Sequence, residues 1–344
     1  MRSLCARIPV AQGEFLHKKL TDAKLIDKNL MIKHNDRFLF IPLCSHPNDS
    51  WLKVFHDMDV ELLEEEFEKY PIRINDYRAN VKLPIELFQH LPRSYDIIGN
   101  IAILKIPEPL NDFSKQIGDA IIKTYKNIKT VAIDFGVKGD RRVRKLKVIA
   151  GVPNTETIHK EYGIKLSLDV SKVYFSPRLS EEHYRISQLV QPGELVLDMF
   201  AGVGPFSIMI AKYSKAQKIY SSDINKFAIK YLIKNIDINK VTNILPFEGD
   251  AKEIIRKIPK VDRIIMNLPF RAHEYISESL MAIKPKGTIH YHEMVSEAEL
   301  STRTDQLKSM AQNYGFSLIS IKEQNLGSYS PSIYHYCFDL ELRK

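Results

Sequence analysis

A glycine-containing segment between two ordered stretches carries the clearest chemical signal in the sequence. The segment Asp198-Met199-Phe200-Ala201-Gly202-Val203-Gly204 follows an apolar run and precedes a helical pattern that begins at Pro205. Glycines at such a strand-to-helix junction let the backbone approach a ligand and leave the amides of the helix N-terminus free. There is no third glycine in GxGxxG spacing and no P-loop lysine, which disfavours a pyrophosphate or triphosphate ligand.

Three carboxylates are expected around this segment because they end successive predicted strands. They are Asp198, Asp223 and Asp250. A carboxylate at Asp198 can meet the cationic amino acid end of S-adenosylmethionine, and one at Asp223 can accept bonds from ribose hydroxyls. Asp250 is placed to bond the adenine amino group. Asp223 or Asp250 taken singly is equally well explained as a helix N-cap, but the three together favour an S-adenosylmethionine site.

A short polar motif ends the next predicted strand. It reads Asn267-Leu268-Pro269-Phe270. An asparagine and main-chain carbonyls at this end of a parallel sheet can bond the edge of a base held beside a methyl donor. Asparagine and proline are also common turn residues, so a purely structural turn is the alternative interpretation.

The elements that must position these residues alternate between strand and helix from about residue 176 onward. Strand-like runs cover residues 194–200, 218–223, 244–248 and 261–266, and helical patterns begin at Pro205 and cover residues 226–238. This repetition predicts an α/β fold with a doubly wound, mostly parallel sheet over residues 176–344. The strand-like end, residues 334–342, predicts an edge hairpin of that sheet.

Two smaller regions precede the sheet. Residues 1–70 have an α+β pattern, with a helix expected near residues 13–23, an apolar strand at 37–42 and an acidic helical segment at 61–68. Residues 71–175 are strand-rich, with runs at 97–107, 130–133, 146–151 and 164–170. The sequence therefore predicts three domains, 1–70, 71–175 and 176–344.

Bulk composition narrows the class of protein. The 344 residues carry a formal charge of +8, which mildly favours a polyanionic partner. The three cysteines are widely scattered, which argues against a disulfide framework or a zinc site. No apolar stretch reaches the ~18 residues that a membrane span needs, so we expect a cytoplasmic protein with no membrane or metal partner.

Positive charge is concentrated within ten residues of one predicted strand, at Lys138, Arg141, Arg142, Arg144, Lys145 and Lys147. Alternation along a strand places Arg142 and Arg144 on one face and Arg141 and Lys145 on the other. One face can then serve chemistry while the other meets phosphate. The alternative is an exposed edge strand protected by its charge.

Several further motifs point to one family. They are the segments Asp198–Ile208, Asn267–Pro269 with Ala272-His273, Ile289–His292, Tyr174–Arg178 with Glu182 and Arg185, Thr157–Gly163, and Arg142–Leu146. Together they resemble the archaeal and eukaryal type of tRNA (guanine-37-N1)-methyltransferase, well over residues 95–344 and loosely over the first 70. The resemblance implies a Rossmann-like class I methyltransferase sheet with two smaller N-terminal α+β domains, and tRNA as partner of a monomer.

The resemblance also implies roles for individual residues. Guanine N1 carries a proton, so the reaction needs a general base and a group to hold the charge that builds on O6. Glu182 matches the family's base and Arg142 matches the arginine facing O6, while Asn267 and Pro269 would orient the guanine. The first domain would hold the tRNA elbow, and the second would help seat the anticodon stem.

The expected contacts fall into two sets. Cofactor contacts are expected at Arg178, Asp198, Phe200, Gly202, Gly204, Asp223, Ile224, Asp250, Ala251 and Asn267. Substrate contacts are expected at Arg142, Arg144, Lys145, Phe175, Pro177 and Phe270.

Departures from the family pattern keep other functions open. Phe270-Arg271 follows the Asn-Leu-Pro motif where relatives often have lysine, Asn100 stands where aspartate is frequent, and Lys147 where glutamate is common. An aromatic Phe270 keeps open the methylation of a tricyclic wyosine precursor at tRNA position 37, alone or as a second activity. Aminocarboxypropyl transfer, amino-group methylation and a catalytically silent tRNA-binding protein fit the motifs less well.

Overall fold

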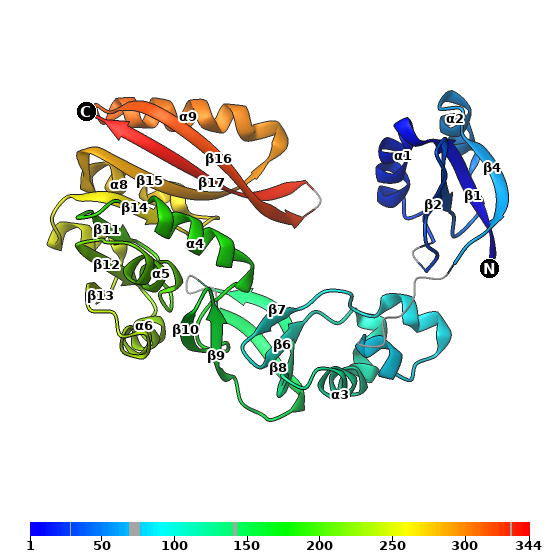
Figure 1. The fold of residues 1–344 in the computed structure, drawn as a ribbon, viewed down its shortest axis with the longest axis horizontal. Coiled ribbons are helices and arrows are strands. Elements are labelled where there is room, and N and C mark those ends of the chain that lie inside the picture. The colour runs from blue at the N-terminus through cyan, green and yellow to red at the C-terminus, as the bar shows by residue number, and fades with distance from the viewer. Residues whose placement is uncertain (28, 69–75, 140–142, 331) are drawn as a thin grey trace. The chain divides into compact units, whose positions relative to one another are not determined.

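The computed structural model describes the chain except residues 28, 69–75, 140–142 and 331. The chain divides into two compact units, Met1–Leu91 and Pro92–Lys344, which are described separately (Figure 1). In the part of the chain that is described, no helix is long and apolar enough to cross a membrane.

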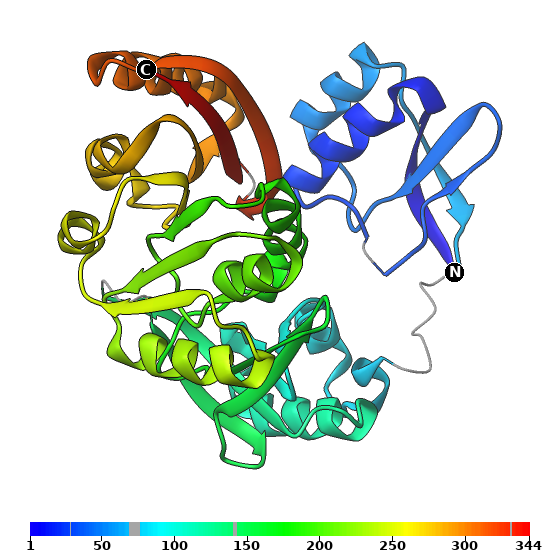
Figure 2. The same cartoon turned by 60° about the vertical axis from the view of Figure 1, so that its left-hand side comes forward.

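The first unit is a four-stranded sheet covered on one face by two helices. The elements of this sheet and its helices are β1 (Arg2–Pro9), α1 (Val10–Asp22), β2 (Lys33–His34), β3 (Phe38–Pro42), α2 (Asp49–Asp57) and β4 (Glu61–Glu66). Two 3₁₀ helices, η1 (Tyr77–Asn80) and η2 (Ile85–His90), follow in the same unit. The strands are antiparallel in the order β2-β3-β1-β4. Leu16 of α1 and Phe55 of α2 pack on Ile8 of β1, which fixes both helices on the same face (Figure 2).

The acidic segment of this unit is a strand, so the helix expected at residues 61–68 is wrong. β4 pairs antiparallel with β1, which sets Glu61 opposite Arg7. Ion pairs join Glu61 to Arg7 and, at 3.1 Å, Glu64 to Arg2. β1, distant in sequence, thus supplies both backbone partners and opposite charges for a segment whose own charge pattern fitted a helix face equally well.

The second unit begins with a smaller sheet. Strands β5 (Asp96–Ile98), β6 (Ile101–Leu104), β7 (Thr130–Lys138) and β8 (Val143–Gly151) lie side by side in that order, and α3 (Ser114–Thr124) connects the parallel pair β6 and β7. The hairpin β9 (Glu156–Glu161) and β10 (Ile164–Asp169) follows. The strand-rich pattern expected for this region matches these elements.

A seven-stranded sheet forms the rest of the second unit, in the order β13-β12-β11-β14-β15-β17-β16. Its first five strands are parallel, and β17 and β16 are added antiparallel at the edge. The Rossmann-like α/β fold and the edge hairpin expected from the sequence are confirmed. The strands are β11 (Leu195–Asp198), β12 (Lys218–Asp223), β13 (Ile244–Glu248), β14 (Val261–Met266), β15 (Ile283–Ser296), β16 (Ser317–Ser330) and β17 (Ile333–Arg343).

Alternation along the central strands divides the core into two layers. Val196 of β11 packs with Ile186 and Ile208 in one layer, whereas its neighbour Leu197 packs with Leu280 and Leu307 in the other. Helices α4 (Ser180–Leu189), α5 (Pro205–Tyr213) and α6 (Lys226–Asn239) cover the first face, and α7 (Ala251–Ile254), α8 (Ile276–Ala282) and α9 (Leu300–Asn313) cover the other (Figures 1 and 2). The carboxyl ends of the parallel strands therefore lie at one edge of the sheet, between the two layers of helices.

Candidate active site

The loop between β11 and α5 needs glycine at two positions. Gly202 and Gly204 have φ values of +55° and +91°, where other residues are strained. A Cβ on Gly204 would lie 2.4 Å from Leu232 Cδ1 of α6, so a larger residue would also collide with the helix. The Gly202 amide donates a 2.7 Å hydrogen bond to Asp223, which ties the loop to the end of β12.

Asp198, at the end of β11, is a buried carboxylate with one oxygen satisfied. Its Oδ2 accepts a 2.7 Å bond from the Ser207 hydroxyl. Its Oδ1 is also buried and has no hydrogen-bond partner among the described residues. Burial raises the pKa of Asp198 to about 7, against the opposing effect of the Ser207 bond. A cationic group placed at Oδ1 would satisfy it and hold the carboxylate ionised, as the amino end of the expected cofactor would do.

Asp223 is oriented by two backbone amides. Each oxygen accepts one bond, Oδ2 from Gly202 at 2.7 Å and Oδ1 from Asn225 at 2.8 Å. Burial raises the pKa of Asp223, while these bonds act in the opposite direction. A carboxylate oxygen has a second lone pair, so each can still accept a bond from a hydroxyl. The next residue, Ile224, is exposed.

Asp250 has the capping role that the sequence left open. Its Oδ1 accepts a 2.9 Å bond from the Lys252 amide, at the N-terminus of α7. Ala251 beside it is buried. The proposed bond from Asp250 to adenine remains a prediction.

An aromatic pair borders the loop. Phe200 is half-buried, and its ring meets Tyr275 edge-on with centroids 4.9 Å apart. The unsatisfied Asp198 oxygen, the glycine backbone and this apolar edge fit an adenosyl amino acid better than a phosphate ligand.

The motif after β14 is a fixed turn with one unsatisfied acceptor. The Leu268 carbonyl accepts 2.8 Å bonds from the amides of Arg271 and Ala272, and the Pro269 carbonyl accepts one of 3.1 Å from Met294. The Asn267 Oδ1 is buried and has no hydrogen-bond partner in the described ranges. The motif is therefore a turn, as the alternative interpretation held, and it also presents a free acceptor that a base edge can use.

Phe270 follows this turn and is 43% exposed. Its ring meets Tyr329 of β16 edge-on, with centroids 5.2 Å apart. Tyr329 is also exposed, at 60%. The two rings form a surface aromatic pair beside the motif.

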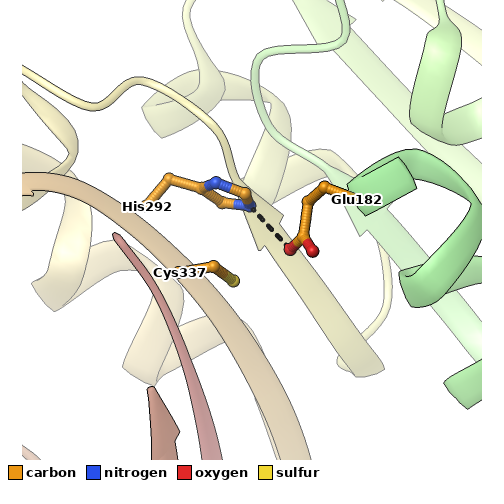
Figure 3. Close-up of side chains that lie close together, drawn as sticks. All are labelled: Glu182, His292 and Cys337. Carbon is orange, nitrogen blue, oxygen red and sulfur yellow. Dashed lines mark ion pairs between the residues drawn. The ribbon is translucent and has the colours of Figure 1, made fainter. Parts of the chain in front are cut away.

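Glu182 lies on α4 and is almost completely buried (Figure 3). Arg185, one turn later, donates to both of its oxygens, at 2.6 and 2.8 Å. The same guanidinium donates to both oxygens of Asp339 on β17, at 2.7 and 3.1 Å. A bidentate pair of this kind fixes the direction of the Glu182 carboxylate.

The hydrogen bonds continue from Asp339 into the sheet. Asp339 is 2.5 Å from His290 Nδ1, and His290 Nε2 is 2.7 Å from the Arg263 guanidinium. Because arginine can only donate, Nε2 is the acceptor and Nδ1 carries the proton. Burial alone would raise the pKa of Asp339, but the bonds from His290 and Arg185 hold it well below its usual value. Arg263 in turn pairs with Glu194 at 2.7 Å.

His292 and Cys337 complete the surroundings of Glu182 (Figure 3). Donor atoms of Glu182, His292 and Cys337 lie within 4.8 Å of one another, a spacing that a metal ion can bridge. Arg185 already binds both carboxylate oxygens, however, and its charge repels a cation. Burial also raises the pKa of the Cys337 thiol well above its usual value. This donor set therefore fits a hydrogen-bonded carboxylate better than a metal site.

Of the basic residues expected on one strand, Arg141 and Arg142 lie outside the described residues, and β8 begins at Val143. Arg144 is engaged within the protein, with bonds to Asp96 at 2.9 Å and Asp134 at 3.1 Å. Lys145 is exposed and lies 6.0 Å from the Phe135 ring.

Three other predicted contacts lie near Arg144. Arg178 also binds Asp96, at 3.0 Å, while 68% of its side chain stays exposed. Phe175 is buried, and its carbonyl lies 3.4 Å from Arg144; Pro177 is half-buried. Whether these residues touch cofactor or substrate stays a prediction.

Sequence reasoning missed several residues that support the site. Asn235, fully buried in the middle of α6, donates to the Val203 carbonyl at 2.9 Å and to Ser167 of β10 at 3.1 Å, so it supports the glycine loop. A polar residue within an apolar helical stretch was the available signal. Asp339 and Arg263 gave no such signal, because their partners are distant in sequence.

A Rossmann-like sheet with a glycine loop after its first strand and carboxylates at successive strand ends defines a class I methyltransferase. Residues 157–319 match the TRM5/TYW2 methyltransferase domain, 78–155 the TYW2 N-terminal domain and 5–50 the tRNA methyltransferase 5 N-terminal domain. The chain belongs to the TRM5/TYW2 methyltransferase family, as the sequence motifs predicted.

Individual relatives agree with this family. The chain is 41% identical over 342 residues to tRNA (guanine(37)-N(1))-methyltransferase Trm5b of Pyrococcus abyssi, covering 99% of both chains. The crystal structure of that Trm5b superimposes with a TM-score of 0.73 at 40% identity, covering 99% of this chain and 100% of the other. A complex of aTrm5 with tRNALeu gives 0.67 at 34% identity, covering 98% and 99%. The tRNA 4-demethylwyosine(37)-methyltransferase Taw21 of Saccharolobus solfataricus is 32% identical over 260 residues, covering 74% and 95%.

Proposed function

We propose that this chain transfers a methyl group from S-adenosylmethionine to N1 of guanosine 37 in tRNA. The observation that carries the proposal is Glu182, a buried carboxylate held by Arg185 beside the strand ends of a TRM5/TYW2 methyltransferase fold. The names of the similar Trm5b proteins support the same substrate.

The cofactor side is the loop after β11. Asp198 would bind the amino group, Asp223 the ribose hydroxyls, and Gly202 and Gly204 would admit the ligand against the backbone. Bound there, S-adenosylmethionine supplies an electrophilic methyl group. The unsatisfied oxygen of Asp198 supports this assignment more directly than Asp250 does, because Asp250 already caps α7.

The reaction side removes a proton and positions the base. Glu182 takes the proton from guanine N1, which turns a poor nucleophile into a good one. Arg142 would hold the charge on O6, an assignment that rests on the family motif alone. Asn267, with its unsatisfied carbonyl oxygen, and Pro269 orient the guanine for attack on the methyl group.

The tRNA side combines charge with exposed aromatic rings. The chain carries a formal charge of +8, and Lys145 is exposed on β8. Because such binding releases counterions from the phosphate backbone, tRNA affinity should fall steeply from low to moderate salt. The target base must leave its stack to reach the site, and Phe270 and Tyr329 offer rings for the unstacked bases.

A second substrate is favoured by one observation. The Phe270 ring is exposed beside the base-binding motif, where it offers a stacking surface suited to a tricyclic base. The similarity to Taw21 supports methylation of a wyosine precursor at the same position, alone or as a second activity.

Methyl transfer from labelled cofactor to unmodified tRNA transcripts, followed by nucleoside analysis, tests these proposals. N1-methylguanosine from a guanosine-37 transcript, and no product from an adenosine-37 transcript, would establish the main activity. A wyosine-precursor tRNA would then test the second. No product from the guanosine transcript, with cofactor binding intact, would contradict the main proposal and leave the modified base as the substrate.

A further inference from the structure

His292 on β15 has a polar atom that the fold leaves unsatisfied. The side chain is completely buried, and its Nε2 has no hydrogen-bond partner among the described residues. A buried nitrogen in this state costs free energy that an apolar side chain of similar size would avoid. Such a position calls for an explanation beyond packing.

The ring is placed between the expected base and a second histidine. Its Nε2 lies 3.9 Å from Glu182 Oε1, and Figure 3 shows the ring turned toward that carboxylate. Its Nδ1 lies 3.3 Å from His335 Nε2 on β17. His292 has no exposed surface, whereas His335 keeps 9%. The two rings therefore form a line from Glu182 toward the surface.

The proposed reaction creates a need for such a line. Methylation breaks the N1–H bond of guanine and forms an N1–C bond to the methyl group, whose bond to sulfur breaks. The sulfonium charge disappears and one proton is left over. Since Glu182 receives this proton in a buried position, the proton has to leave before the carboxylate can act again.

We propose that His292 and His335 carry the proton from Glu182 toward solvent. Glu182 gives its proton to His292 Nε2 while the proton on His292 Nδ1 passes to His335 Nε2, so that one N–H bond forms on His292 as another breaks. His335, then an imidazolium, releases one proton to solvent and returns to its neutral form. The inference rests on the proposed role of Glu182 as base. His292 acts through Glu182 and does not contact the reacting atoms.

The other groups that face Glu182 are unsuited to this task. Arg185 is always protonated and can only donate. Burial raises the pKa of Cys337 well above its usual value, so this thiol keeps its own proton. Asp339 is separated from Glu182 by the Arg185 guanidinium, which binds both. Among the described residues around the carboxylate, His292 is the remaining acceptor.

The surroundings of His292 favour passing a proton on. It faces Glu182 and Arg185 from α4, Cys337, Asp339 and His335 from β17, and His290 on its own strand. Burial, followed by the neighbouring histidines His335 and His290, lowers the pKa of His292 well below its usual value. The ring is therefore neutral before transfer and does not retain an added proton.

Comparing the rates of two events tests the relay. Methyl transfer to a guanosine-37 transcript is followed by rapid quench with labelled cofactor, and proton release is followed in weak buffer with an indicator dye. In the wild type, one proton should appear per methyl group at the rate of methyl transfer. In His292→Gln and His335→Gln, proton release should lag methyl transfer by about 10²-fold, at the low end of what one proton-transfer group contributes.

Tyr291→Phe is the matched control, because Tyr291 is buried on the opposite face of the same strand. Both rates should be unchanged in this variant. Equal slowing of the two events in His292→Gln, or no slowing, would overturn the relay and leave His292 a structural residue. Absence of methyl transfer in the wild type would overturn the proposed function, and the relay with it.

A measurement on the unaltered protein guards against misfolded variants. Nitrogen NMR of histidine-labelled wild-type protein reports which ring nitrogen carries the proton. The relay requires His292 to be protonated at Nδ1 and bare at Nε2 while Glu182 is ionised. A proton on Nε2 would overturn the proposal whatever the variants do.

Discussion

The two sides of the candidate active site are assembled from contacts of very different range. On the cofactor side, Ser207 binds Asp198 nine residues away and Gly202 binds Asp223 over 21 residues. On the base side, Arg185 binds Asp339 across 154 residues. The first set forms within one strand–helix–strand unit, β11–α5–β12, whereas the second requires β17, the last strand in the chain, to be in place.

This difference predicts different effects of substitution on the two sides of the site. A substitution on the cofactor side should change ligand affinity and leave folding nearly intact. A substitution in the chain of bonds from Glu182 to Arg263 should change both the reaction and the stability, because the same side chains join α4 to β15 and β17.

Glu182→Gln should have the largest effect. It keeps the shape of the side chain but removes the proton acceptor, so the single-turnover rate of methyl transfer should fall by about 10²–10⁴-fold. The cofactor dissociation constant, measured by calorimetry, should stay within about twofold because Asp198 and Asp223 are untouched. Glu181→Gln is the control, since Glu181 is the exposed neighbour on α4. Equal losses in the two variants, or equal loss of rate and affinity, would contradict the assigned role.

Asp339→Asn should follow, with an effect on stability and rate together. It removes one of the two carboxylates that bind Arg185, and the free energy of unfolding should fall by about 3 kcal/mol, the low end for breaking a buried pair, because Glu182 still binds the guanidinium. The bonds of Asp339 hold its pKa below the unfolded value, so its stabilisation is fully present above the unfolded pKa and is lost as pH falls through the folded pKa. Urea denaturation should therefore give the same difference at pH 7 and pH 5, and a smaller one below about pH 4.

Two outcomes would count against this coupling of stability and rate. Asp305→Asn, on the exposed face of α9, should leave both unchanged. If Asp339→Asn were as stable as the wild type but slower, the bond to Arg185 would serve the reaction alone. If it were less stable but equally fast, Arg185 would hold Glu182 without help from β17.

The sequence predicted those parts of the candidate site whose residues lie close together in the chain. The strands that end at Asp198, Asp223 and Met266 were found because apolar runs alternate with helical patterns, and the glycine loop because its neighbours are adjacent in the chain. Hydrogen bonding at Asp250 could not be settled, because an aspartate after a strand suits both a helix cap and a ligand.

Contacts between distant strands could not be predicted in the same way. The register of β15 and β17 sets His292 opposite Cys337, with His335 diagonal to it, and no local pattern encodes that register. The motif Ile289–His292 was recognised as a family feature, yet its contact with Glu182 required the folded sheet. The error at β4 has the same origin, since its strand partner β1 lies more than 50 residues earlier in the chain and no local pattern encodes their pairing.

Asp198→Asn should change the pH dependence of cofactor binding, an effect confined to the cofactor side of the site. Because burial raises the pKa of Asp198 to about 7, the carboxylate is largely protonated below that pH and cannot balance a cationic amino group. Wild-type cofactor affinity should rise as pH increases through about 7. The variant should bind at least about tenfold more weakly at pH 8, with no such rise, for the loss of one charge-assisted bond.

Calorimetry at several pH values measures both effects of Asp198→Asn. Asp237→Asn, which removes a charge from the exposed side of α6, is the control and should follow the wild type. A pH-dependent affinity that survives in Asp198→Asn would assign the titration to another group. At low pH, Asp198→Asn and the wild type should unfold at the same urea concentration, since asparagine resembles the protonated Asp198 side chain.

Phe270→Ala should have the smallest effect and should fall on tRNA alone. The Phe270 ring is exposed, and Tyr329 beside it can still stack on a base after Phe270 is removed. The loss of Phe270 should therefore raise KM for tRNA by about fivefold, at the low end for stacking on one base. Cofactor affinity and the single-turnover rate at saturating tRNA should not change. Tyr314→Ala, at another exposed aromatic residue, is the control and should change none of the three quantities. A larger rise for a wyosine-precursor tRNA than for a guanosine-37 tRNA would show that the ring selects the tricyclic base. An equal rise for both would place the ring against a neighbouring nucleotide of the loop, and no rise for either would remove Phe270 from the substrate side of the site.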